Sequence, residues 1–353
     1  MMIPIKIGPS KEISQESGIE KVTFQSLQLT EANIEEFLRK NIQILFDDED
    51  DDETLLIVGQ QVVNLKGARN DLVALDGDGN LVLIEIKRDA ADIISRSESM
   101  EFQAVRYAAS LATITDIDDL VQRVFARYIK KWSNEFELGE LTPEELGKRL
   151  VGKFLRDNDA EKSFNTRQRI ILVSSSFDDQ TLSAAAWMSV NGIDISCVSL
   201  NPIRSTGSTG PLYLSAERIV PVKKVEEYFV GFDNPTTITP DSSSGTAFKK
   251  TRRSQPRMPQ LMEWGIVQKG MTLTLKGFED SQAIVQDSNT VEFKGQIMPF
   301  NQWGLKVSGW SSISVYDWAV TPEGKTLSQL RADYMEKNAA TQSSNHVNSA
   351  DQS

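Results

Sequence analysis

The chain has 353 residues, of which 39% are hydrophobic and 25% are charged, and this length predicts two domains. One histidine, His346 in a polar tail, and one cysteine argue against a Ser-His nucleophile, a histidine-rich zinc site and an intramolecular disulfide. The formal net charge is −12, yet seven consecutive acids at 47–53 carry much of it, so binding to DNA must be local. No apolar stretch approaches the length of a membrane span and no secretory signal opens the chain, so we expect a cytoplasmic protein without a membrane partner.

The first part of the chain predicts short strands over residues 1–29 and then a helix over 31–45. Thr30 is a suitable N-cap, and apolar residues recur at helical spacing after it. On this helix Glu35 lies at the edge of the apolar face, whereas Glu36 neighbours Arg39 and Lys40 on the solvent side. The acidic run at 47–53 follows and is expected to form a solvated loop, because like charges repel.

Residues 55–87 have a strand pattern, in which Asp76–Asn80 joins the last two strands as a hairpin loop. If this loop has five residues, Leu75 pairs with Leu81, and counting back places Asp71 opposite Glu85. Glu85 and Lys87 share one strand face because side chains alternate.

The rest of the chain predicts helices over about 91–113 and 117–155 and then a strand–helix–strand unit with its helix at 178–190. A crossover of this length implies parallel strands, with Cys197 buried in the second one. Residues 232–257 have a linker composition, 258–338 form a second compact unit, and 339–353 are expected to be disordered.

The pair Asp71 and Glu85 carries the chemistry that the sequence predicts. Two like charges directly opposed across strands are destabilising, so a positive group is expected between them, and hard oxygen ligands suit Mg²⁺ or Mn²⁺. Lys87 could then orient or deprotonate water, or stabilise developing phosphate charge. Gln103 and Tyr107 stand at i and i+4 on the next helix. Chance spacing, ordinary helix-surface residues and simple turn formation by Asp76 and Asp78 remain the alternative interpretations.

Together these motifs resemble the PD-(D/E)XK nuclease superfamily in the branch with a trailing Q-x-x-x-Y. IEEFLRKN, RNDLVALDGDGNLVLIEIKRD and QAVRYAASLA are similar to segments of NucS-type endonucleases. The resemblance implies Asp71 and Glu85 as metal ligands and a catalytic group formed by Lys87, Glu35, Gln103 and Tyr107. The chain departs from the family at Asn70, which replaces the motif proline, and at the acidic run.

The segment from 259 to 338 is similar to the restriction-enzyme-adenine-methylase-associated (RAMA) domain, which is proposed to read DNA. LMEWGIVQKGMTLTL, WSSISVYDWA and GKTLSQLRADY carry this similarity. Its tryptophans, at 264, 303, 310 and 318, are otherwise expected in a core. We expect six basic residues to contact nucleic acid: Arg69, Lys249, Lys250, Arg252, Arg253 and Arg257. For the five residues in 249–257, the alternative is that they belong to a plain solvated linker.

The expected fold is α/β, a restriction-endonuclease-like mixed sheet flanked by helices, with a small α+β C-terminal domain. Its parts are a nuclease domain at 1–231, a basic linker at 232–257, a RAMA-like domain at 258–338 and a tail at 339–353. The expected function is Mg²⁺- or Mn²⁺-dependent DNA endonuclease activity in repair, restriction or phage defence. The alternative is a non-catalytic reader of modified DNA, and the sequence leaves an RNA substrate and a homodimer open.

Overall fold

The structure is a computed structural model and describes residues 5–15, 19–46, 53–63, 67, 69–89, 98–205, 210–221 and 255–337. Contacts divide the chain into two compact units, the first made of Met1–Asp48 and Leu56–Thr251 and the second of Glu49–Leu55 and Arg252–Ser353. Several segments named above lie outside the described residues: most of the acidic run, most of the basic linker, the start of the helix expected at 91, and the C-terminal tail. Within the described residues, no helix combines the length and apolar character that crossing a membrane requires.

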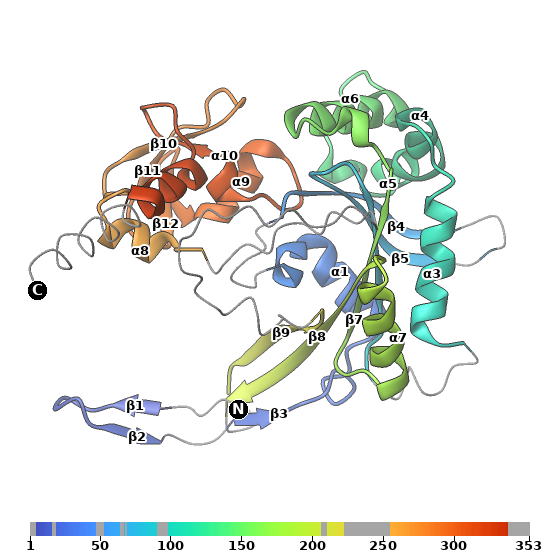
Figure 1. Ribbon diagram of the computed structural model, residues 1–353, viewed down its shortest axis with the longest axis horizontal. Coiled ribbons are helices and arrows are strands. Elements are labelled where there is room, and N and C mark those ends of the chain that lie inside the picture. Colours follow the sequence, from blue (N-terminus) through green and yellow to red (C-terminus); the bar gives the residue numbers. More distant parts are fainter. Residues whose placement is uncertain are drawn as a thin grey trace, which may run out of the picture. The chain divides into compact units, whose positions relative to one another are not determined.

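A mixed seven-stranded sheet forms the centre of the first unit (Figure 1). Its order is β3-β8-β7-β6-β5-β4, and β9 also pairs with β8. β5 and β6 are antiparallel, while β6, β7 and β8 are parallel, which confirms the predicted parallel pairing. The strands are β3 (Ile19–Lys21), β4 (Leu55–Val63), β5 (Arg69–Asp76), β6 (Leu81–Ile86), β7 (Gln168–Ser174), β8 (Asp194–Ser205) and β9 (Leu212–Val220), and β1 (Ile5–Ile7) and β2 (Ile13–Gln15) form a separate antiparallel ribbon.

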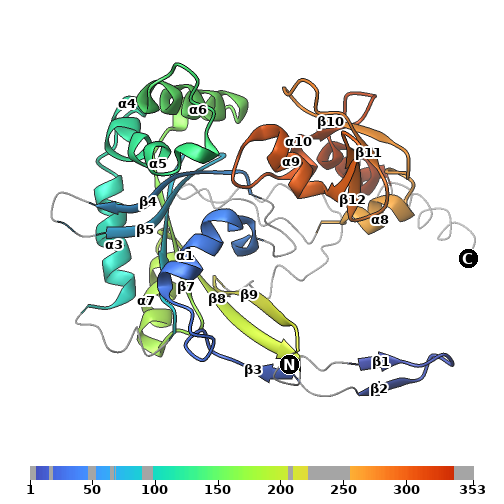
Figure 2. The same ribbon diagram turned by 180° about the vertical axis from the view of Figure 1, so that it is seen from behind.

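Helices cover both faces of this sheet. α1 packs against β5 and β6 on one face, whereas α3 and α7 pack against β6, β7 and β8 on the other (Figures 1 and 2). The helices are α1 (Glu31–Lys40), α3 (Met100–Leu111), α4 (Ile117–Leu120), α5 (Ala126–Lys131), α6 (Pro143–Asp157) and α7 (Asp179–Val190), with short 3-10 helices η1 (Ile42–Leu45), η3 (Ser133–Glu135) and η4 (Glu161–Ser163) and a π-helical turn η2 (Val121–Phe125). Every residue of β6 is buried, as expected for a central strand covered on both faces.

The helix that carries Glu35 begins where the sequence predicts. The side chain of Thr30 accepts a hydrogen bond from the backbone N–H of Asn33, and the Asn33 side chain accepts one from the Thr30 N–H in return. The α-helix ends at Lys40 and a 3-10 turn follows, so the single helix expected to residue 45 is two elements.

The second unit contains a five-stranded antiparallel sheet in the order β13-β12-β11-β10-β14. Trp303, Trp310 and Trp318 are buried as predicted, whereas Trp264 is only half-buried and stacks on Tyr334 with ring centroids 4.4 Å apart. The elements are β10 (Thr272–Leu275), β11 (Ala283–Val285), β12 (Thr290–Phe293), β13 (Gln296–Pro299), β14 (Ala319–Val320), α8 (Met258–Glu263), α9 (Phe300–Ser308), α10 (Val315–Trp318) and helical residues 327–337.

Candidate active site

The β5–β6 hairpin carries two of the predicted acidic residues, one just beyond each end of its last strand pair. Leu75 pairs with Leu81 and Leu72 with Ile84, which confirms the predicted register. The paired register ends at Leu72 and Ile84, and continuing it by one step would bring Asp71 opposite Glu85. Opposed like charges destabilise a strand pair unless other groups compensate them. The neighbours of each carboxylate therefore decide what this arrangement can do.

Glu85 is compensated by Lys87, which lies immediately after β6. The Lys87 Nζ is 2.5 Å from Glu85 Oε1, and the two side chains are only 2% and 1% exposed. Lys87 also donates from Nζ to the Ile86 carbonyl at 3.0 Å and from its backbone N–H to the Val173 carbonyl at 2.8 Å. The ammonium group is thereby fixed next to the end of β6 on the carboxylate that it neutralises.

Asp71 uses both of its carboxylate oxygens. Oδ2 accepts from the backbone N–H of Ile86 at 2.8 Å, and Oδ1 accepts from Gln61 Nε2 at 3.2 Å. Burial raises the pKa of Asp71 above its ordinary value, against the opposing effects of the Lys87 charge and of these hydrogen bonds. Asp71 is therefore an acid whose charge is costly to hold and which a nearby cation would stabilise.

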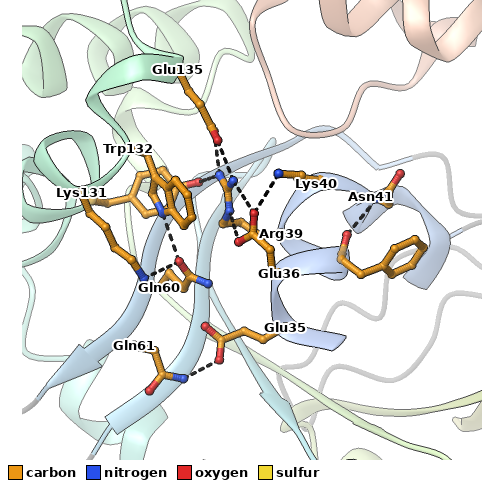
Figure 3. Close-up of polar contacts among 12 residues, drawn as sticks. Glu35, Glu36, Arg39, Lys40, Asn41, Gln60, Gln61, Lys131, Trp132 and Glu135 are labelled. Carbon is orange, nitrogen blue, oxygen red and sulfur yellow. Dashed lines mark hydrogen bonds and ion pairs between the residues drawn. The ribbon is translucent and has the colours of Figure 1, made fainter. Parts of the chain in front are cut away.

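Glu35 of α1 belongs to the same group. Glu35 is 5% exposed, and its Oε2 lies 2.5 Å from Gln61 Nε2 (Figure 3). The pKa of Glu35 is raised, first by burial and then by the charge of Asp71, while hydrogen bonding from Gln61 and Gln60 lowers it. One amide, that of Gln61, thus connects the carboxylates contributed by α1 and β5.

The remaining predicted catalytic residues form a pair on α3. Gln103 Nε2 donates to the hydroxyl of Tyr107 at 2.9 Å, with Tyr107 buried and Gln103 half-buried. The i, i+4 spacing therefore produces a real contact. The hydrogen bond fixes the two side chains relative to each other, and their helix, α3, packs on the face of the sheet opposite to α1 (Figures 1 and 2).

The sequence pattern predicted that Arg39 lies on the solvent side of α1, but the structure buries it. Its side chain is 2% exposed and donates to Glu36, Glu135 and the Tyr128 hydroxyl at 2.7 to 3.0 Å. Its guanidinium also lies 3.8 Å from the centroid of the Trp132 ring (Figure 3). Hydrogen bonding to Arg39 lowers the pKa of Glu36 to about 2. Arg39 thus ties α1, and with it Glu35, to the segment at 126–135.

Sequence reasoning missed Gln60 and Gln61 of β4. The two amides follow Gly59 inside an otherwise apolar strand, and this interruption was the available signal. Gln61 has a positive φ of 52°, a conformation that non-glycine residues rarely adopt and that often marks a functional site.

The predicted nucleic-acid residues are only partly described. Arg69 is exposed at the start of β5 in the first unit, and Arg257 is half-buried at the N-cap of α8 in the second. Lys249, Lys250, Arg252 and Arg253 lie outside the described residues. Their basic character is a property of the sequence alone.

The donor chemistry of the site suits a hard divalent cation. Among the described residues, no three His, Cys, Asp or Glu side chains form a metal-binding cluster. Mg²⁺, however, is usually bound by one or two carboxylates together with water and substrate phosphate. Asp71 and Glu85 would supply two carboxylates here, and burial raises the pKa of Asp71, as expected where a negative charge is poorly solvated.

Comparisons with known proteins add no further constraint. No protein-family model matches the chain, and neither the curated proteins nor the solved structures contain a match. The residues of the chain itself are therefore the basis for assigning its function.

Proposed function

We propose that the chain is a metal-dependent endonuclease that hydrolyses DNA phosphodiester bonds and has the restriction-endonuclease-like fold of the PD-(D/E)XK superfamily. One observation carries the proposal: at the end of a central hairpin, whose register continued by one step pairs Asp71 with Glu85, Lys87 is fixed on Glu85 and Gln61 joins Glu35 to Asp71. These are the positions that the resemblance to this superfamily assigns to its motif residues. The mixed sheet with helices on both faces also supports it.

Four of the site residues have a defined part in such a hydrolysis. Asp71 and Glu85 would hold the divalent cation, which when bound polarises the phosphate and lowers the pKa of an attacking water. Lys87, whose side-chain nitrogen is fixed on Glu85, would stabilise negative charge that develops on the phosphate oxygens. Water adds to phosphorus, the P–O ester bond breaks, and a phosphate monoester and a hydroxyl group are released. Glu35 would orient the water through its carboxylate.

A second function, a non-catalytic reader of modified DNA, is favoured by one specific observation. The side chains of Glu85 and Lys87 are 1% and 2% exposed, as in an ion pair whose only role is structural. In this case the nuclease-like unit is a scaffold, and recognition belongs to the second unit. The reader hypothesis predicts tight DNA binding without cleavage in the presence of any metal.

Plasmid cleavage distinguishes the two functions. Supercoiled DNA is incubated with Mg²⁺ or Mn²⁺ and one of three proteins: wild type, Asp71→Asn, or the double variant Glu85→Gln/Lys87→Met. The double variant removes both charges of the buried pair. We expect nicking by wild type and a fall of at least about 100-fold in both variants. The matched control is Asp118→Asn/Lys148→Met, because these residues form an exposed ion pair at 2.9 Å in the same unit.

Two outcomes would contradict the nuclease proposal. Equal nicking by wild type and both site variants would show that the activity belongs to a contaminant. Tight binding by a wild-type protein that cleaves with neither metal would favour the reader. Parallel incubations with single- and double-stranded DNA and RNA of one sequence determine which nucleic acid is the substrate.

A further inference from the structure

Two consecutive glutamines of β4 point to the same carboxylate. Neighbouring side chains of a regular strand point to opposite faces of a sheet. Gln61, however, has a φ of 52°, and this left-handed residue interrupts the alternation. Its Nε2 lies 2.5 Å from Glu35 Oε2 (Figure 3), and the Gln60 amide is close enough to the same carboxylate to lower its pKa. The local backbone conformation therefore brings two amides to one acid.

The orientation of the Gln60 amide is determined by its other partners. Its Oε1 accepts from Lys131 Nζ at 2.7 Å and from Trp132 Nε1 at 3.0 Å. An ammonium group and an indole N–H can only donate, so the carbonyl oxygen of Gln60 must face them. The NH₂ group is then the part of the amide that remains for Glu35. Trp132 is itself held by the Arg39 guanidinium over its ring.

The Gln61 amide performs a different task, because it spans two acids. Besides Glu35, its Nε2 donates to Asp71 Oδ1 at 3.2 Å. An NH₂ group carries two hydrogens, so one can point to each carboxylate. The amide thus sets the distance between two like charges that would otherwise move apart.

We propose that Gln60 and Gln61 are positioning residues for Glu35, and that Lys131 and Trp132 hold Gln60 in the orientation this requires. The inference rests on the proposed nuclease function, in which Glu35 acts within the site. It makes the end of α5 part of the catalytic arrangement, because Lys131 and Trp132 both donate to the Gln60 amide oxygen.

The first test separates positioning from DNA binding. Gln60→Ala removes one amide, and Gln61→Gly removes the other while keeping a residue that adopts positive φ readily. We expect kcat for plasmid cleavage to fall about 10- to 100-fold in each variant, with KM for DNA unchanged. Lys131→Met should lower kcat less, and Lys130→Met, at the exposed neighbouring lysine, should leave it unchanged. A rise in KM without loss of kcat in Lys131→Met would show a direct DNA contact and overturn its proposed role.

The second test asks whether Gln60 acts through Glu35. In a Glu35→Gln background, we expect Gln60→Ala to cause no further fall in kcat, because the group that it positions is already lost. The same four proteins are unfolded with urea, and their unfolding free energies should be non-additive. Additive effects in both measurements would overturn the inference.

The two proposals fail in different ways. A wild-type protein that cleaves no nucleic acid would overturn the proposed function, and with it the catalytic meaning of the two glutamines, even if the unfolding measurements show coupling. A wild-type protein that cleaves while Gln60→Ala and Gln61→Gly retain full kcat would overturn the positioning role alone.

Discussion

Glu35 is buried and Asp71 is half-buried, so water solvates both carboxylates less well than in the unfolded chain. Burial is the largest cause of the raised pKa of each, and the charge of Asp71 adds to the effect on Glu35. A raised carboxyl pKa in the folded state means that folding favours the protonated form. The stability contributed by Glu35 is therefore complete below its ordinary pKa of 4.5 and is lost as the pH rises through the raised value.

Glu35→Gln should remove this dependence. Glutamine is neutral at every pH, so the variant does not lose stability as Glu35 ionises in the wild type. We expect the difference in unfolding free energy, variant minus wild type, to increase between about pH 4 and pH 8. The altered hydrogen bonds add a term to this difference that does not depend on pH. Urea unfolding across this range measures the difference. A difference that stays flat, or equals that of Glu137→Gln at an exposed position, would contradict the raised pKa.

At the scale of elements, the β5–β6 turn sets which residues face each other at the site. Asp76 Oδ1 accepts from the backbone N–H groups of Asp78 at 3.1 Å and Asn80 at 2.8 Å, which confirms that aspartate forms this turn. Gly79 has a φ of 87°, and its carbonyl accepts from the Asn165 N–H at 2.7 Å. The turn is therefore fixed both internally and against the segment before β7.

Gly79→Ala should destabilise the protein more than the same change at Gly139. Both glycines have positive φ, so both variants bear the backbone cost of alanine in this region, about 1 kcal/mol. A Cβ at Gly79 would also lie 3.0 Å from the Ala160 carbonyl oxygen, whereas nothing lies within 4 Å at Gly139. We expect a loss of at least about 2 kcal/mol for Gly79→Ala in urea unfolding followed by circular dichroism. Equal losses would show that the Ala160 contact relaxes freely.

The same elements show what local sequence can and cannot predict. The Leu75–Leu81 register follows from a short loop and strand alternation, both of which are local, and it is confirmed. The position of Arg39 was predicted wrongly, because its burial depends on Glu135, 96 residues later in the chain. Gln60 and Gln61 were missed because the positive φ of Gln61 breaks the alternation on which strand prediction depends.

At the scale of the whole molecule, charge is distributed unevenly between segments. The net charge of −12 includes seven consecutive acids at 47–53, whereas five of the nine residues in 249–257 are basic and none is acidic. Attraction to the phosphates of DNA acts locally and is screened by salt. A protein whose net charge is negative can therefore bind DNA through one basic segment, if the DNA can reach this segment.

Neutralising that segment tests the DNA-binding part of the proposal in the full-length chain. Each phosphate contact adds about 0.9 to the slope of log affinity against log salt concentration, so replacing all five basic residues of 249–257 with serine should lower the slope by up to about 4.5. Fluorescence anisotropy of labelled DNA at 50 to 200 mM salt measures it. Five exposed basic residues of the first unit are the control set, with the same change in net charge: Lys148, Arg149, Arg156, Lys162 and Arg167. An equal fall in slope for both sets would show that only net charge matters and that 249–257 is a plain linker.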